Sequence, residues 1–165
     1  MDNVSPQRRS ANMSRIRSRD TKPELTVRHY LHTRGFRYRL HVRQLPGKPD
    51  LVFPSRKLCL FVHGCFWHGC PHCIDGTRLV KSNRRFWAAK VQGNRDRDSR
   101  HFEALQALGW TVLIVWECEV SQPARLSQLA EEIRRIVGVR QKKKPDPHTP
   151  RGPPPTSAPF ARGRA

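Results

Sequence analysis

The sequence predicts an α/β domain with a mixed central sheet flanked by helices, and three observations predict it. Short apolar runs rich in β-branched and aromatic residues alternate with longer segments whose apolar residues recur at helical spacing. Proline and glycine clusters separate the segments. The predicted order is helix, helix, three strands, helix, strand, helix, which is typical of a mixed sheet with helices packed on it.

Two helices are predicted before the first strand. Ser5 and Pro6 supply an N-cap and a first-turn proline for a short basic helix that runs to about Arg17. The segment Thr21-Lys22-Pro23-Glu24 has the pattern of a capping box. The helix that it opens is expected to end at Gly35, where a left-handed C-cap is readily adopted.

The strands follow from alternation and from turn residues. Residues 36–42 alternate apolar side chains with arginines and His41, which predicts a half-exposed strand with a basic polar face. After a turn at residues 46–49, residues 50–53 and 57–62 predict a hairpin with a buried second strand. The remaining predictions are a helix from Ser82 to Leu108, a strand at residues 110–116 and a helix at residues 123–137.

The charge of the chain predicts a polyanionic partner. The 165 residues include 32 Lys and Arg against 13 Asp and Glu, a formal net charge of +19. Nucleic acid is favoured over a membrane surface, because we find neither a basic amphipathic helix with an exposed apolar face nor a run of about 18 apolar residues. We expect a soluble protein of the cytoplasm, without membrane contact.

One folded domain, residues 1–138, and a tail, residues 139–165, are predicted. The tail holds half of the 14 prolines and few apolar residues, so we expect it to be disordered. It carries seven Lys or Arg and one Asp, which leaves a net charge of +13 for residues 1–138. The prediction of a nucleic-acid partner therefore does not depend on the tail.

Four of the five cysteines predict a structural zinc site. A Cys-x-x-Cys pair is the usual local clamp for a tetrahedral zinc ion, and it follows the predicted strand 57–62. The predicted ligands are Cys65, Cys70, Cys73 and Cys118, with His72 as an alternative to Cys70. Cys59 lies inside an apolar strand and is assigned to the core. An odd number of cysteines fits disulfides poorly.

A catalytic site is predicted where two strands meet. Asp50 begins one strand and His63 ends its neighbour, so the two chain ends should approach each other at one edge of the sheet. A carboxylate that holds Mg²⁺ and a nearby imidazole would suit phosphodiester hydrolysis. Other roles remain open: Asp50 as a turn carboxylate, and His63 and His68 as structural histidines or zinc ligands.

Several motifs together resemble the very short patch repair (Vsr) family of DNA mismatch endonucleases. They are Pro46 to Asp50, Phe61 to His68, Phe86-Trp87 and Trp110 to Cys118. The resemblance extends from about Asn12 to Cys118 in unchanged order. It implies a restriction-endonuclease-like fold in which Phe61-Val62-His63 replaces the usual second acidic-lysine motif.

The resemblance implies a Mg²⁺-dependent endonuclease that recognises a T:G mismatch, formed when 5-methylcytosine deaminates. It would nick the DNA strand 5′ of the mismatched thymine and so start very short patch repair. Double-stranded DNA with the mismatch is the implied substrate. Mismatch-repair proteins and a companion cytosine-5 methyltransferase are implied as further partners of a monomer that associates with the bacterial nucleoid.

The resemblance also implies roles for individual residues. Asp50 would hold magnesium together with the backbone carbonyl of Val62, which stands where the best-known members have a threonine. His68 would be the general base, and His63 would assist at the scissile phosphate. The implied catalytic residues are Asp50, His68, His63, Glu24, which orders metal-bound water, and Asp98, which orients the base. A capping role for Glu24 is compatible with this one.

An aromatic wedge is implied for mismatch recognition, because a mismatched step stacks poorly and is opened at lower cost. Phe66 and Trp67 lie in the cysteine-rich segment, which is expected to be a rigid exposed loop. By family position Trp87 joins them, and Met13 from the DNA-contacting arm, residues 1–20, enters from the minor groove. Core packing on a helical apolar stripe with Phe86 is the alternative for Trp87.

Two alternative functions remain at this stage. A non-catalytic, zinc-stapled DNA-binding protein explains the charge, the cysteines and the aromatic residues, but it leaves Asp50, His63 and His68 without a task. A restriction-type endonuclease shares the fold and the metal, but it has no need of an aromatic wedge. The bases that flank the mismatch do not follow from the sequence.

Overall fold

The computed structural model describes residues 7–8, 19–78 and 83–138. Of the helix predicted from Ser5 to about Arg17, only Gln7 and Arg8 are described, and both are helical. The predictions for Met13, for a cap at Ser82 and for the tail at residues 139–165 lie outside the described residues.

A four-stranded mixed sheet forms the centre of the fold. Its strands are β1 (Arg39–Leu40), β2 (Leu51–Phe53), β3 (Leu58–His63) and β4 (Thr111–Trp116), in the order β1-β2-β3-β4. The first two pairings are antiparallel, whereas β3 and β4 are parallel. This confirms the predicted α/β architecture with a mixed sheet.

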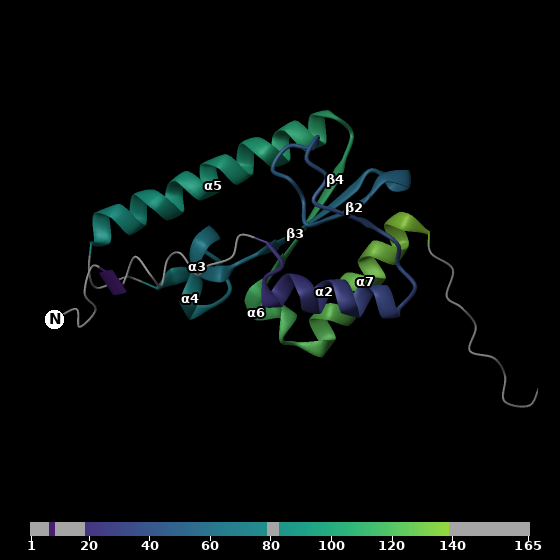
Figure 1. Cartoon of the computed structure of the whole chain (residues 1–165), viewed down its shortest axis with the longest axis horizontal. Coiled ribbons are helices and arrows are strands. Elements are labelled where there is room, and N and C mark those ends of the chain that lie inside the picture. Colours follow the sequence, from purple (N-terminus) through teal and green to yellow (C-terminus); the bar gives the residue numbers. More distant parts are fainter. Residues whose placement is uncertain (1–6, 9–18, 79–82, 139–165) are drawn as a thin grey trace, which may run out of the picture.

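Helices cover both faces of the sheet (Figure 1). Helix α2 (Lys22–Thr33) and helix α7 (Pro123–Val137) lie on one face, and the long helix α5 (Arg84–Ala107) lies on the other. The short elements are η1 (Pro54–Arg56), α3 (Cys65–His68), α4 (Ile74–Thr77) and α6 (Glu117–Val120). No helix of the described residues is both long and apolar enough to cross a membrane.

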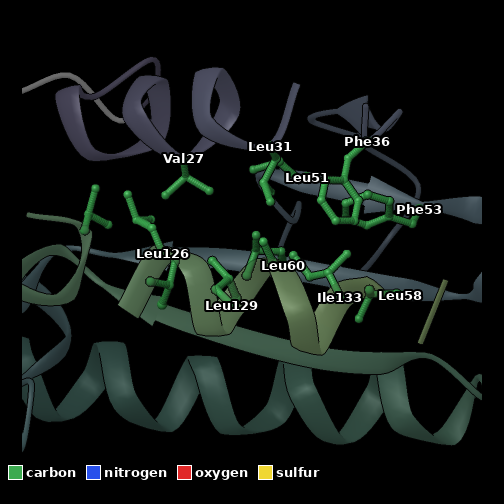
Figure 2. Packing of buried hydrophobic residues seen from close by; sticks show 13 residues of the cluster. Val27, Leu31, Phe36, Leu51, Phe53, Leu58, Leu60, Leu126, Leu129 and Ile133 are labelled. Atoms are coloured by element: carbon green, nitrogen blue, oxygen red, sulfur yellow. The ribbon is translucent and has the colours of Figure 1, made fainter. Parts of the chain in front are cut away.

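Strand alternation divides the core into two clusters. Leu58 and Leu60 of β3 face α2 and α7, where they pack with Val27, Leu31 and residues of α7 (Figure 2). The intervening Cys59, with Phe61, packs against Leu105 of α5. The thiol of Cys59 is fully buried, in agreement with its assignment to the core.

The first predicted strand is shorter than expected. Only Arg39 and Leu40 of residues 36–42 pair with β2. His41 has a left-handed backbone conformation with φ of 46°, which ends the extended run, and Phe36 is buried near the end of α2. The His41 side chain contacts Arg28 of α2, and this contact accounts for the conformation better than the alternation of residues 36–42 does.

The cysteine-rich segment contains two one-turn helices, α3 and α4, and is not the loop that was predicted. Helix α3 begins directly after β3, and the N-terminal half of α5 passes alongside it, beyond the sheet (Figure 1). Among the α5 residues, only Asn94 and Leu105 are buried. Only the C-terminal half of α5 therefore serves the core, and the N-terminal half supports α3.

Candidate active site

One cavity of about 650 Å³ is lined by all five residues that were predicted to be catalytic. They are Glu24 of α2, Asp50 before β2, His63 at the end of β3, His68 of α3 and Asp98 of α5. A larger hollow of about 950 Å³ along α2 is lined by none of these five. The smaller cavity is therefore the candidate active site.

Asp50 lies where β2 begins beside the end of β3. Its Oδ2 atom accepts a hydrogen bond of 2.7 Å from the backbone N–H of Val62. Burial raises the pKa of Asp50 to about 6 against the lowering effect of this hydrogen bond, and the Glu24 carboxylate adds to the increase. A positive charge beside Asp50 would restore its ionised form.

His68 is paired with Asp98, and the His68 Nδ1 atom lies 2.5 Å from the Asp98 Oδ2 atom. Burial acts to raise the pKa of Asp98, but the hydrogen bond from His68 and the charges of nearby imidazoles outweigh it, so this pKa is lowered. An ionised Asp98 favours the tautomer of His68 that carries its proton on Nδ1. The Nε2 atom is then free to accept a proton.

His63 is stacked on His68, with ring centroids 4.0 Å apart and ring planes inclined by 14°. It is only 5% exposed, and its Nδ1 atom has no hydrogen-bond partner among the described residues. Burial, reinforced by the neighbouring His68, lowers the pKa of His63 to about 4. His63 is therefore neutral at pH 7.

Glu24 is buried at the start of α2. Its carboxylate accepts hydrogen bonds from the Asp20 backbone N–H at 3.0 Å, from the Thr21 hydroxyl at 2.9 Å and from Arg28 Nη2 at 2.9 Å. Thr21 caps the helix as predicted. In a capping box the Glu24 carboxylate would accept a hydrogen bond from the Thr21 backbone N–H, but here it accepts one from the Asp20 N–H. Glu24 therefore both stabilises the start of α2 and lines the cavity.

Arg28 and His41 complete this network, and the sequence reasoning missed both. The guanidinium of Arg28 also pairs with the Asp20 carboxylate, and its Nη2 atom lies 2.9 Å from His41 Nε2. Glu24 and Arg28 are four residues apart in α2, and this spacing is a recognisable signal for an ion pair on a helix. No comparable signal exists for His41, 13 residues away from Arg28.

The cavity suits a hard divalent cation. The buried carboxylate of Asp50 is disfavoured in its charged form by burial and by the nearby Glu24 carboxylate, and a cation would relieve both effects. Carboxylate and carbonyl oxygens are ligands that Mg²⁺ prefers in proteins. Asp50 and Val62, which also lines the cavity, are the residues that could hold such an ion.

The structure brings the four predicted zinc-binding cysteines together. The Sγ atoms of Cys65, Cys70, Cys73 and Cys118 all lie within 4.8 Å of one another. The Sγ atoms of Cys70 and Cys118 are 3.8 Å apart, which matches the edge of a zinc–sulfur tetrahedron, about 3.8 Å for Zn–S bonds of about 2.3 Å. The alternative ligand His72 is exposed and outside this group.

Backbone amides support two of these sulfur atoms. Cys65 Sγ accepts a hydrogen bond of 3.3 Å from the Cys118 N–H, and Cys70 Sγ accepts one of 3.3 Å from the His72 N–H. Such bonds to sulfur are the outer-shell contacts that orient thiolate ligands. The four sulfurs fit a closed tetrahedral site, which is characteristic of structural zinc.

A half-buried aromatic cluster lies beside the cavity. Phe66 and Trp67 of α3 contact Trp87 of α5, with ring centroids 5.3 and 5.9 Å from it. None of the three belongs to either core cluster, so Trp87 packs against α3 and not in the core. Trp67 also lines the cavity.

Phe86, which shares the helical stripe in the core-packing alternative for Trp87, is 54% exposed. Its ring lies 5.3 Å from that of Trp87, which extends the aromatic cluster toward solvent. The core-packing alternative does not apply, because this part of α5 extends past the sheet and has no core to face. Periodicity alone does not reveal where a helix leaves its sheet.

Positive charge surrounds the site. Arg19, Lys48, Lys90 and Arg97 line the cavity together with the catalytic candidates. Basic side chains around a cavity attract the phosphates of a nucleic acid. The net charge predicted such a partner, but it did not reveal which of the 32 Lys and Arg face the site.

Comparisons with known proteins agree with this site. The family model described as DNA mismatch endonuclease Vsr matches residues 1–74. The chain is 49% identical over 136 residues to the type II nicking enzyme V.XorIIP of Xanthomonas oryzae pv. oryzae, covering 82% of this chain and 96% of that protein. It is 39% identical over 122 residues to the DNA mismatch endonuclease Vsr of Escherichia coli, covering 74% of this chain and 77% of that protein.

The mixed sheet, the cavity of carboxylates and imidazoles at its edge, and these relatives define a DNA endonuclease. The chain belongs to the Vsr family. The resemblance carried by the sequence motifs is thereby confirmed.

Proposed function

We propose that this chain is a Mg²⁺-dependent, T:G mismatch-specific endonuclease that nicks the DNA strand 5′ of the mismatched thymine and starts very short patch repair of deaminated 5-methylcytosine. One observation carries the proposal: Asp50, His63, His68 and Asp98 line one cavity, and Trp67 of the aromatic cluster lines it too. The names of the relatives, a DNA mismatch endonuclease and type II nicking enzymes, support a single-strand cut.

The residues of the cavity divide the hydrolytic work. Asp50 and the Val62 carbonyl would hold Mg²⁺, which supplies Lewis-acid polarisation of the scissile phosphodiester when bound. His68 takes the proton of the attacking water on Nε2, and the ionised Asp98 stabilises the imidazolium. His63, neutral and stacked on His68, donates an N–H to the phosphate.

Glu24, which also lines the cavity, would order the water bound to the metal, and its bonds to Arg28 and to the Thr21 hydroxyl hold the carboxylate in one orientation. Residues 1–20 contribute an arm that brings Met13 to the minor groove. One cavity is sufficient for cutting one strand, so the protein acts as a monomer. A cytosine-5 methyltransferase would generate the methylated base whose deamination yields the substrate.

Mismatch selection rests on the aromatic cluster. Phe66, Trp67 and Trp87 lie together at one end of the site, where they can enter a base step that is weakened by the mismatch. Each base–aromatic contact contributes about 1–3 kcal/mol. A structural zinc ion held by the four cysteines would tie α3, which begins at Cys65 and carries two of the three rings, to α6, which contains Cys118.

A duplex series tests the function. Purified protein with Mg²⁺ is incubated with labelled duplexes that carry T:G, C:G or T:A at one position, and both strands are resolved after the reaction. We expect nicking of the thymine strand of T:G alone, 5′ of the thymine, and no product from the Asp50→Ala protein. Cleavage of both strands of a matched duplex would instead indicate a restriction-type enzyme, and binding without cleavage a DNA-binding protein.

The wedge gives a separate prediction. Trp67→Ala should reduce nicking of the T:G duplex by about 10- to 100-fold, as expected for the loss of one stacking contact. Leu108→Ala, which removes another half-exposed apolar side chain at the far end of α5, should leave the rate unchanged. The rates are measured with substrate below saturation, and equal rates for the two variants would remove Trp67 from the wedge.

A further inference from the structure

The end of α3 is held from outside by α5. The carbonyls of the last turn of any helix lack partners within the helix, and α3 has only four residues, too few for a helix that is stable by itself. Tertiary contacts must therefore fix its geometry. This matters because α3 carries Phe66, Trp67 and His68, and because it begins at Cys65 and is followed, after its C-cap Gly69, by Cys70.

Three successive carbonyls at this end accept hydrogen bonds from α5. The Asn94 side-chain amide donates to the Trp67 carbonyl at 2.8 Å. The Arg95 guanidinium donates from Nε to the His68 carbonyl at 3.3 Å and from Nη2 to the Gly69 carbonyl. One arginine thus binds both carbonyls that follow the wedge residue.

The fit of Arg95 on this turn is close. Gly69 has a left-handed φ of 62°, and a Cβ atom built on it would lie 2.6 Å from Arg95 Nη2. Asp98, one turn farther along α5, holds the His68 ring. Arg95 therefore binds the backbone of the residue whose side chain Asp98 orients, and together they fix both ends of His68.

We propose that Arg95 is a positioning residue for the nicking reaction: its bonds to the His68 and Gly69 carbonyls hold the general base in place. The inference rests on the proposed function of His68. Asn94 and Trp87 still hold the wedge when Arg95 is removed, because they bind Trp67 independently. Loss of Arg95 therefore slows the chemical step. Its effect on the affinity for DNA is no larger than that of removing any other exposed positive charge.

The test compares full-length wild-type protein with Arg95→Met, Arg95→Lys and the control Arg100→Met, which removes another exposed arginine of α5. Single-turnover nicking of the T:G duplex should be about 10- to 100-fold slower in Arg95→Met than in Arg100→Met, the scale of a small displacement of a catalytic group. The Kd for the same duplex without Mg²⁺ should agree between the two within about 3-fold, since each removes one surface charge. Arg95→Lys should recover part of the rate, because an ammonium can still donate to one carbonyl.

Amide hydrogen exchange gives a readout that does not depend on activity. The His68 and Cys70 amides bond to the Gly64 and Cys65 carbonyls inside the α3 turn. In Arg95→Met these two amides should exchange at least about 10-fold faster, while amides of β3 keep their rates. Unchanged exchange would overturn the inference, whether or not the wild-type protein nicks the mismatch.

The remaining outcomes are also decisive. Equal nicking rates for Arg95→Met and Arg100→Met would make Arg95 an ordinary surface cation. A rate loss that is accompanied by loss of bound zinc would assign the effect to the cysteine cluster and refute a direct role at His68. If the wild-type protein nicks no duplex, the proposed function fails, and faster exchange in Arg95→Met then shows a contact that only supports the fold.

Discussion

Asp50→Asn is expected to abolish nicking and, at the same time, to stabilise the fold at neutral pH. Asparagine is a poor ligand for a hard cation compared with a carboxylate, so the rate on the T:G duplex should fall at least about 1000-fold. The same substitution removes a buried negative charge that is opposed by burial and by Glu24. Its amide oxygen can still accept the hydrogen bond that Val62 donates to Asp50.

The stability effect depends on pH in a definite direction. Burial raises the pKa of Asp50 from 3.8 to about 6, so folding favours the protonated form. Protonated Asp50 contributes to the free energy of unfolding of the wild-type protein. This stabilisation is fully present below pH 4 and is lost as the pH rises through 6. Two pKa units correspond to about 3 kcal/mol, an upper value for the gain of Asp50→Asn at pH 7.

Urea unfolding in Mg²⁺-free buffer at pH 4 and pH 7 measures this difference. The variant and the wild-type protein should have equal free energies of unfolding at pH 4, and the variant should be more stable at pH 7. Asp75→Asn is the matched control, since the Asp75 side chain is 71% exposed and should show no such gain. A less stable Asp50→Asn protein at pH 7, or one that still nicks, would contradict the role assigned to Asp50.

Local chain geometry accounts for part of the predicted site, whereas Glu24 and Asp98 came from the family resemblance. Asp50 and His63 belong to one hairpin, so their proximity follows from antiparallel pairing over a short turn. Cys70 and Cys73 are likewise close in sequence. Cys118 joins them only because β4 lies parallel to β3, and this pairing between distant segments was not predicted.

The parts that were missed depend on side chains from separate elements. Arg95 is one of 32 Lys and Arg, and composition gives no reason to single it out. The turn of α3 is too short for a periodic pattern to reveal it, because its geometry comes from contacts with α5. The truncated strand before His41 has the same cause, since the Arg28–His41 contact overrides the alternation of the sequence.

Removal of one cysteine of the cluster should have the second large effect, on both folding and activity. Burial raises the pKa of Cys65, and it raises that of Cys118 to about 11, so without a cation these thiols stay protonated and release their protons when zinc binds. Cys73→Ser removes one of the two half-buried members and should reduce bound zinc from about one ion per chain to none. The expected loss of stability is about 4 kcal/mol, the value for a ligand at a thousand times its Kd.

Zinc analysis, thermal unfolding and nicking of the T:G duplex check this outcome on the same preparations. Cys59→Ala is the control: it removes a fully buried thiol of β3 outside the cluster, so it should lower stability slightly and keep both zinc and activity. Nicking should vanish with the zinc, because Cys65 and Cys70 lie at the two ends of the turn that presents Trp67 and His68. Folded, active protein recovered without zinc would show that the packing of α3 against α5 suffices to hold this turn.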